Sequence, residues 1–263
     1  MKRGLLAVLN AFAVFASLLV LWQMVVWMTH VQPYMLPAPM QVFRAMGLRW
    51  GSLLGSLLTT SEEAAGGLAA SIVIGVLVAL IFAQSHWVRR TFYPYTILLQ
   101  TVPIVAVAPL ILMWVGTGTY AVMLISFIIS VAPIIANTTQ GLISVDENMV
   151  NLFLMHNASR GQLLTRLRLP HAVPSLFVGI RISSGIAVIG AITGELFAGS
   201  SRVGQGGLGY SIVYASAQME TDYLFALVLA ATALGFAFFF TVMFLEWYFL
   251  HHWHESARAG GRE

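Results

Sequence analysis

The chain has 263 residues, of which 59% are hydrophobic and only 9% are charged, and its formal net charge is +3. A soluble domain carries about 25% charged residues, so most of the surface of this chain is expected to face lipid. The modest positive charge, without a dense patch of Lys and Arg, argues against a nucleic-acid-binding surface. The chain has no cysteine, which excludes disulfides and thiolate metal sites.

Six apolar runs are long enough to form spanning helices, which need about 20 mostly apolar residues each. The first run follows Lys2-Arg3, as in a signal peptide. It is too long for the apolar core of such a peptide, and no small-residue cleavage site follows it before Pro33, so we expect a retained helix. The six predicted spans are Leu5–Met28, Leu57–Phe82, a run after Thr91 marked by Pro103 and Pro109, Tyr120–Thr138, Pro174–Phe197 and Tyr223–Leu250.

The third and fourth spans share a stretch, from Thr91 to Val145, that contains no charged residue. Gly116-Thr117-Gly118 is expected to form the turn between them. The sequence therefore predicts an all-α fold: a polytopic transmembrane helical bundle of about six spans, forming a single domain over residues 1–263.

The basic residues predict the orientation of the spans. With six spans, both termini lie on one side of the membrane. That side would hold Lys2, Arg3, Arg89, Arg90, Arg160, Arg166, Arg168, Arg258 and Arg262, and the other side would hold Arg44, Arg49 and Arg202. The positive-inside rule then places both termini and the segment Asn151–Pro170 in the cytoplasm.

Small residues recur at four-residue spacing on two spans, at Gly67, Ser71 and Gly75 and again at Gly190 and Gly194. This spacing lets helix backbones approach closely in lipid. Packing within one bundle and packing at a dimer seam are both compatible with it, and the first is the simpler interpretation.

Two further stretches are expected on the outer face. His30–Met46 contains LPAPMQVFRAM, which predicts a proline-rich turn followed by a short amphipathic helix. Gly199–Asp222 predicts a glycine-rich loop. Gly204, Gly206 and Gly209 have the spacing of a dinucleotide-binding motif, but that motif needs a preceding strand, and none is expected here.

Few ionisable residues lie within the predicted spans. Glu62 and Glu63, at the outer end of the second span, are expected at the membrane interface, with a water-filled pathway as the alternative. Glu195, near the outer end of the fifth span, is a candidate for the translocation pathway, because ionisable groups inside spans are often functional. A position at the membrane interface or a bond to a neighbouring helix would equally explain it. Arg181 and Glu246 are predicted to form an ion pair, which would lower the cost of burying both charges.

The cluster His251, His252, Trp253 and His254 suggests either a metal site or an aromatic belt at the membrane interface, and Trp247 and Tyr248 favour the belt. No nucleotide-binding loop, serine nucleophile elbow or His-Glu-x-x-His pair occurs. We therefore predict no catalytic residue and no metal site. Active transport by this chain would need energy from a partner or from an ion gradient.

The segment Asn151–Pro170 is polar and basic although it lies between spans. Its apolar residues are interrupted at residues 157–161, where Ser159 is expected to cap a helix beginning near Arg160. Pro170 and Pro174 are expected to bound a short turn before the fifth span. The sequence thus predicts a short helix, a bend and a second helix, which either docks a soluble partner or lies at the interface without one.

This segment resembles the coupling loop of permease subunits of bacterial ABC importers, the binding-protein-dependent transport permeases. Their pattern is Glu-Ala-Ala, three residues, Gly, about nine residues, and a hydrophobic-x-Leu-Pro ending. Here the ending is Leu167-Arg168-Leu169-Pro170, and Ala158-Ser159-Arg160 matches the Ala-Ser-Arg that often follows the glycine. Asn151, Leu152-Phe153 and Asn157 replace Glu, the two alanines and Gly. Because Asn adopts the left-handed turn almost as Gly does, we expect the bend to be kept.

The resemblance extends over nearly the whole chain. LPAPMQVF, Gln100-Thr101-Val102-Pro103, Ala108-Pro109-Leu110, Ala191–Glu195 and Gly207-Leu208-Gly209-Tyr210 are similar to the nitrate, sulfonate and taurine permease group. VGIRISSGIAVIGAITGE and the non-alanine coupling head look closer to importers of thiamine-pyrimidine precursors or riboflavin.

The resemblance implies a type I ABC importer permease in the bacterial inner membrane. Its partners would be a second permease, a copy of itself in a homodimer, two cytoplasmic ATPases that bind ATP and Mg²⁺, a periplasmic or lipid-anchored solute-binding protein, and membrane lipid. It implies ATPase coupling by Asn151, Phe153, Asn157, Ala158, Ser159, Arg160, Leu163, Leu164, Leu169 and Pro170, and a translocation pathway at Gln100 and Glu195. The alternatives are an ion-gradient-driven transporter, which would need inverted repeats that are not obvious here, and a passive channel or scaffold.

Overall fold

A computed structural model describes residues 2–29, 31–199 and 206–251, with the side chains of residues 2–12 and Phe15 left aside. Within these ranges every regular element is a helix. In chain order the elements are α1 (Lys2–Thr29), α2 (Pro39–Leu48), α3 (Trp50–Gln84), α4 (His86–Thr101), α5 (Ile104–Val115), α6 (Thr119–Ile143), α7 (Glu147–Met155), α8 (Arg160–Leu163), the π-helix η1 (Leu164–Arg168), α9 (Leu169–Ala198), α10 (Leu208–Ala217) and α11 (Thr221–Leu250).

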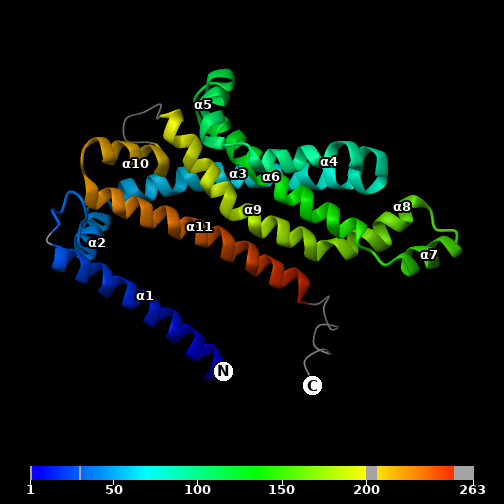
Figure 1. The fold of residues 1–263 in the computed structure, drawn as a ribbon, viewed down its shortest axis with the longest axis horizontal. Coiled ribbons are helices and arrows are strands. Elements are labelled where there is room, and N and C mark those ends of the chain that lie inside the picture. Colours follow the sequence, from blue (N-terminus) through cyan, green and yellow to red (C-terminus); the bar gives the residue numbers. More distant parts are fainter. Residues whose placement is uncertain (1, 30, 200–205, 252–263) are drawn as a thin grey trace.

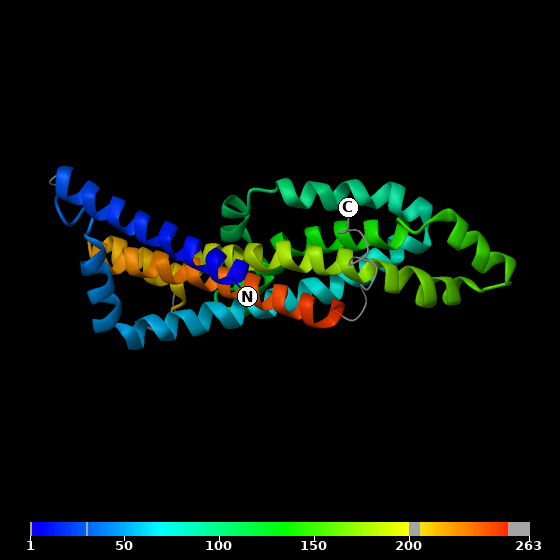
Figure 2. The ribbon, with the colours of Figure 1, turned by 90° about the horizontal axis from the view of Figure 1, so that it is seen from below.

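The molecule is elongated, with the long helices running along it (Figures 1 and 2). At one end lie α2, α10 and the start of α11, and at the other end lie α7 and α8 (Figure 1). We call these the α2–α10 end and the α7–α8 end. The first is built from loops and short helices between spans, and the second from the segment singled out in the sequence.

Four helical stretches are long and apolar enough to cross a membrane: Trp50–Gln84, Thr119–Ile143, Arg160–Ala198 and Thr221–Leu250. They confirm the second, fourth, fifth and sixth predicted spans and extend each of them. The first predicted span corresponds to α1, whose described apolar part is Ala16–Thr29. The predicted amphipathic helix on the proline-rich stretch is confirmed as α2.

The third predicted span is broken. Its two halves, α4 and α5, differ in direction by 100°, with only Val102 and Pro103 between them (Figure 1). Val102 is extended, as a residue before proline prefers to be, and Pro103 has no N–H to continue the hydrogen-bond ladder of α4. The prolines therefore turn one apolar run into two short helices.

The centre of the bundle is α6, which packs against both α3 and α9. A Cβ added at Gly75 would lie 2.8 Å from Ile134 Cγ2, and one added at Gly190 would lie 2.8 Å from Ser126 Cα. The glycines therefore let the helices of one chain approach each other. This finding supports the simpler of the two interpretations of their spacing.

Hydroxyl groups join the same three helices. Ser71 Oγ and Ser130 Oγ lie 2.7 Å apart, between α3 and α6. Ser183 Oγ on α9 donates to the carbonyl oxygen of Ser130 at 2.6 Å, and Ser126 Oγ donates to that of Ala187 at 2.9 Å. In lipid, small residues and such hydrogen bonds replace the hydrophobic effect in holding helices together.

The predicted turn at Pro170 and Pro174 is wrong, because α8, η1 and α9 run as one helical stretch of 39 residues. The π-helix explains why the chain continues. The N–H of Leu169 donates five residues back, to the carbonyl oxygen of Leu164. Pro170 follows at the second position of α9, where its missing N–H breaks no established α-helical turn.

Candidate functional site

The segment at the α7–α8 end starts from a capped helix. Asp146 precedes α7, and its Oδ1 accepts a hydrogen bond from the backbone N–H of Asn148 at 2.7 Å. A carboxylate at this position satisfies an otherwise free N–H and interacts favourably with the helix dipole. The short α7 can therefore form although none of its side chains is buried.

The bend between α7 and α8 has a defined hydrogen-bonded geometry. Asn157 adopts a left-handed conformation, with φ of 54°. The N–H of Ala158 donates to the carbonyl oxygen of Phe153 at 3.0 Å, and the N–H of Asn157 donates to that of Leu154 at 2.9 Å. This pair of bonds is a Schellman motif, in which Asn replaces the usual glycine. The predicted bend at Asn157 is confirmed.

Ser159 begins the second helix, as predicted. The N–H of Gln162 donates to Ser159 Oγ at 3.2 Å, and the N–H of Ser159 donates to Gln162 Oε1 at 2.8 Å. This reciprocal arrangement is a capping box. The segment is therefore ordered by its own sequence, and its conformation does not depend on buried side chains.

Four apolar residues of α7 have exposed side chains. Met149, Leu152 and Leu154 are about half exposed, and Met155 is 81% exposed. Such a group of exposed apolar side chains outside the spans is typical of an interaction surface. From the sequence we predicted that the contact centres on Phe153, which is only partly exposed. Met149 and Leu154 were not predicted, because the sequence of so short a helix does not show which of its faces is exposed.

The ten predicted coupling residues fall into two groups. Asn151, Asn157, Ser159 and Arg160 are exposed, and Phe153, Ala158, Leu163, Leu164, Leu169 and Pro170 are partly buried. Leu164 and Leu169 pack against a buried cluster that includes Ala83 and Ala172. Part of the set thus presents polar groups, and part attaches the segment to α3 and α9.

Arg168 strengthens this attachment. Its Nη1 donates to the carbonyl oxygen of Ala83 at 2.9 Å, at the carboxyl end of α3. A guanidinium at this position binds one of the carbonyl groups left free where a helix ends. Because η1 runs directly into α9, a displacement of α8 would be transmitted to that span.

At the α2–α10 end, Glu195 joins three helices. Its Oε1 accepts a hydrogen bond from Thr60 Oγ1 at 2.6 Å, and its Oε2 accepts one from the N–H of Gly209 at 2.6 Å. Thr60 Oγ1 in turn accepts from the N–H of Leu208 at 2.8 Å. Glu195 and Thr60 therefore cap the amino-terminal end of α10 from two other helices.

This capping explains a correction to the predicted loop Gly199–Asp222. Residues 200–205, Gly204 among them, lie outside the described residues, but Leu208–Ala217 is the helix α10. A Cβ at Gly207 would overlap the carboxylate of Glu195, and a Cβ at Gly209 would overlap the carbonyl oxygen of Ile192. The glycines allow a close approach to α9; they do not make the whole stretch a loop.

The predicted position of Glu63 at the membrane interface is also wrong. It is buried, with 4% of its surface exposed, whereas Glu62 is exposed. The helix α3 begins at Trp50, earlier than predicted, so Glu63 lies roughly 20 Å along it. Its carboxyl group contacts that of Glu195, and Glu63 Oε2 is buried without a hydrogen-bond partner. Both groups line a cavity of about 70 Å³.

The structure does not bring the two predicted pathway residues together. Gln100 is exposed in the last turn of α4, and Glu195 is buried near the end of α9. Glu195 has the helix-bonding role that was its alternative explanation. A role for either residue in a pathway stays a prediction.

Two ion pairs connect α11 to the bundle. The predicted pair is confirmed, with Arg181 Nη2 lying 2.9 Å from Glu246 Oε1. A second pair was not predicted: the guanidinium of Arg49 donates to both oxygens of Glu220, in one case at 2.6 Å. Arg49 also lies 4.8 Å from the ring centre of Tyr223. The hydrogen bonds from Arg49 lower the pKa of Glu220 below its usual value.

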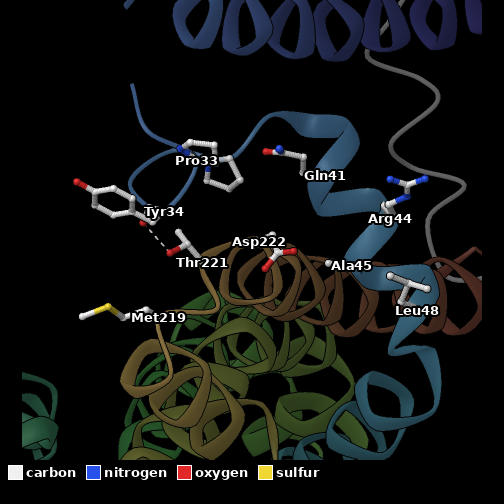
Figure 3. A pocket seen from close by; sticks show the side chains of 10 residues that line it. Pro33, Tyr34, Gln41, Arg44, Ala45, Leu48, Met219, Thr221 and Asp222 are labelled. Atoms are coloured by element: carbon white, nitrogen blue, oxygen red, sulfur yellow. Dashed lines mark hydrogen bonds between the residues drawn. The ribbon is translucent and has the colours of Figure 1, made fainter. Parts of the chain in front are cut away.

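A cavity of about 300 Å³ lies between α2 and the start of α11 at this end. Tyr34, Gln41, Arg44 and Asp222 line it, and Thr221 Oγ1 donates to the carbonyl oxygen of Tyr34 at 2.7 Å (Figure 3). The bond ties the turn before α2 to the start of α11. The ion pair Arg49–Glu220 and this hydrogen bond both attach α2 to the start of α11.

The histidine cluster is described only at His251, whose ring lies 5.1 Å from that of Trp247. His252, Trp253 and His254 lie outside the described residues. No group of three metal-binding side chains occurs within the described ranges. The choice between metal site and aromatic belt therefore stays open.

Known proteins are similar to this chain in sequence or in fold. The chain is 33% identical over 247 residues to the formylaminopyrimidine transport permease protein ThiX of Halalkalibacterium halodurans, covering 94% of this chain and 96% of the relative. It is 33% identical to the riboflavin transport system permease protein RibX of Chloroflexus aurantiacus, covering 73% and 71%. A chain of the inward-facing MetNI methionine ABC transporter matches its fold with a TM-score of 0.52 and 19% identity, covering 75% of this chain and 96% of that one.

A family model describes residues 71–251, which extend from the middle of α3 through the bend at Asn157 to the end of α11. The family is one of transport permeases and not of enzymes. The chain therefore belongs to the family of binding-protein-dependent transport system inner membrane components, as a multi-pass membrane protein.

Proposed function

We propose that this chain forms the translocation pathway of an ATP-driven importer and that α7 and α8 contact a separate ATPase. The observation that carries the proposal is the form of the segment at the α7–α8 end. It is capped and bent by its own residues, it exposes apolar side chains and Arg160, and it continues into the span α9. If a partner outside the membrane displaces such a segment, the displacement is transmitted to the helical bundle.

The movement would be a rigid-body shift. Because Arg160–Ala198 is one helical stretch and Leu164 packs near the end of α3, a displacement of α8 would tilt α9 together with its neighbours. Tilting these helices would change which side of the membrane the pathway opens to. This chain carries no ATP-binding motif of its own, so ATP and Mg²⁺ would be bound by the partner.

We place the α7–α8 end in the cytoplasm. Arg89, Arg90, Arg160, Arg166 and Arg168 lie at the ends of helices on that side, which agrees with the positive-inside rule. In Figure 1, α1 runs toward the α2–α10 end and α11 runs away from it. Both chain termini would therefore lie on the cytoplasmic side.

The complete transporter would contain two permeases, two ATPases and a solute-binding protein outside the membrane. The family description, which names a binding-protein-dependent transport system, supports the last of these partners. We propose a homodimer of the permease, as the resemblance to ABC importer permeases implies. Its solute would be a small polar molecule. The relatives ThiX and RibX, a formylaminopyrimidine and a riboflavin transport permease, favour a vitamin or vitamin precursor over nitrate, a sulfonate or taurine.

The proposal is tested by substitutions in the segment. In the complex reconstituted with its ATPase and solute-binding protein, Phe153→Ala and Arg160→Glu should lower solute-stimulated ATP hydrolysis and uptake about tenfold, because each removes an interfacial contact worth about 1–2 kcal/mol. Both variants should insert into the membrane and unfold close to the temperature of the parent chain, since Arg160 is exposed and Phe153 is only partly buried.

Val73→Ala serves as the control, because Val73 is 58% exposed on the spanning helix α3 and should be indifferent to the ATPase. Unchanged stimulated hydrolysis in both segment variants would reject the coupling role. Uptake without any ATPase would instead favour a transporter driven by an ion gradient, or a channel.

A further inference from the structure

A basic cavity lies beside the segment at the α7–α8 end. It has a volume of about 530 Å³ and is bordered by the end of α3, the start of α4, and the helices α7, α8 and η1. Its polar lining includes His86, Arg89, Arg160 and Arg168, and no described residue that lines it is acidic. Three guanidinium groups around one cavity create a strongly positive site.

The arginines of this cavity have free hydrogen-bonding capacity. Neither Arg89 nor Arg160 forms an ion pair within the described ranges, where the two pairs are Arg49–Glu220 and Arg181–Glu246. Arg168 uses Nη1 to bind the carbonyl oxygen of Ala83, but its Nε is buried without a hydrogen-bond partner. A buried donor of this kind lacks an acceptor, and an oxyanion in the cavity would supply one.

A second, smaller cavity of about 320 Å³ adjoins the first. The two share His86, Arg89 and Ile143, and the second adds Arg90 and Tyr93. Again no described lining residue is acidic. The positive region therefore continues around the start of α4. It is larger than a site that binds one carboxylate.

The position of the cavity matches the headgroup level of the membrane. It lies where α3 ends at Gln84 and α4 begins at His86, and Trp87 beside it is 72% exposed. Exposed tryptophan is typical of the membrane–water interface. Farther along α4, Ile97 and Leu98 expose apolar side chains that would lie against acyl chains.

We propose that this cavity binds the phosphate of an anionic phospholipid headgroup, and that the bound lipid braces the α7–α8 segment against the start of α4. Basic cavities between spanning helices on the cytoplasmic side suit such headgroups. A soluble phosphate would gain nothing from the apolar face of α4, whereas a lipid fills both the charged cavity and that face. Phosphatidylglycerol is the probe that matches this chemistry.

The test uses the full-length permease alone, so that its result is independent of the proposed ATPase coupling. Lipid retained by the purified protein is counted by native mass spectrometry after exchange into equimolar phosphatidylglycerol and phosphatidylcholine. The parent chain should retain phosphatidylglycerol selectively. Arg89→Gln should weaken its binding about fivefold, in line with the contribution of one basic residue near a membrane surface, and Arg89→Lys should largely keep it.

Arg166→Gln is the matched control, since Arg166 carries the same charge at the same end of the molecule, is exposed and does not line the cavity. It should change binding less than twofold. Thermal unfolding without added lipid shows that each variant is folded. Equal retention of the two lipids, equal losses in the two Gln variants, or displacement of the lipid by inorganic phosphate at the same concentration would each overturn the proposal.

Discussion

The two ends of the molecule hold their helices by opposite means. At the α2–α10 end, buried Glu195 and Thr60 form a network that caps α10, and the exposed pair Arg49–Glu220 links the end of α2 to the start of α11. At the α7–α8 end, α7 has no buried side chain, and its order comes from local caps and the bend at Asn157. One end is fastened by contacts between distant parts of the chain, whereas α7 and its bend at the other end are ordered by contacts between near neighbours.

Because of this difference, substitutions at the two ends should affect different properties: folding stability at one end and binding to a partner at the other. Removing a partner from a buried network leaves desolvated groups behind and costs folding free energy. Substituting an exposed side chain on a capped helix costs little folding free energy, and its effect falls on binding. Substitutions at the α2–α10 end should therefore destabilise the protein, and substitutions at the α7–α8 end should leave it folded.

The strongest test of the fastened end is Gly209→Ala. The added Cβ would overlap the carbonyl oxygen of Ile192 and lie 2.8 Å from Glu195 Cβ, so the backbone of α10 would have to move. We expect a loss of about 3 kcal/mol, measured by thermal unfolding in detergent, and poor accumulation in the membrane. In the control Gly185→Ala, on α9, the new Cβ has no atom within 4 Å, so stability should stay equal or rise. Equal losses in the two variants would contradict the network.

The pair between α9 and α11 tests attachment at mid-bundle, between the two ends. Arg181→Glu and Glu246→Arg should each destabilise the fold by about 2 kcal/mol, because each leaves a partly buried charge beside a like charge. The double reversal restores opposite charges and should recover at least half of this loss. Failure of the double variant to exceed either single variant in unfolding temperature would show that the pair does not hold these helices.

The smallest effect concerns the exposed pair at the fastened end. Hydrogen bonds from Arg49 lower the pKa of Glu220 below its usual 4.5, so the pair stabilises the fold above that pH and loses its contribution as the pH falls through the lowered pKa. Solvent screening limits this contribution to about 1 kcal/mol. In Glu220→Gln, the difference in unfolding temperature between neutral and acidic pH should be smaller than in the parent chain. Glu62→Gln, at an exposed carboxylate, should keep the parent's difference.

Local sequence patterns predicted a large part of the structure. Apolar length located four long spans, Asn157 marked the bend, Ser159 marked the second helix, and one ion pair was named correctly. These features depend on residues close together in the chain, or on composition averaged over about 20 residues. They carry over to the fold because lipid requires every spanning backbone to satisfy its own hydrogen bonds.

The errors have three different causes. The helix α10 was predicted as loop because its cap comes from Glu195 and Thr60, and the second of these lies far away in the sequence. The turn at Pro170 was predicted because a π-helical turn has no simple sequence pattern. Glu63 was placed at the interface because the start of α3 was set seven residues too late.

The amino-acid sequence alone showed a multi-pass membrane protein with a polar segment between two of its spans. Hydrophobic length and helix caps depend on residues that are close together in the chain. Only the tertiary structure decided which side chains that segment exposes, which carboxyl groups are buried together, and how three arginines from distant positions surround one cavity. These features depend on how helices approach each other in space, and glycine contacts, proline breaks and one π-helical turn set that approach.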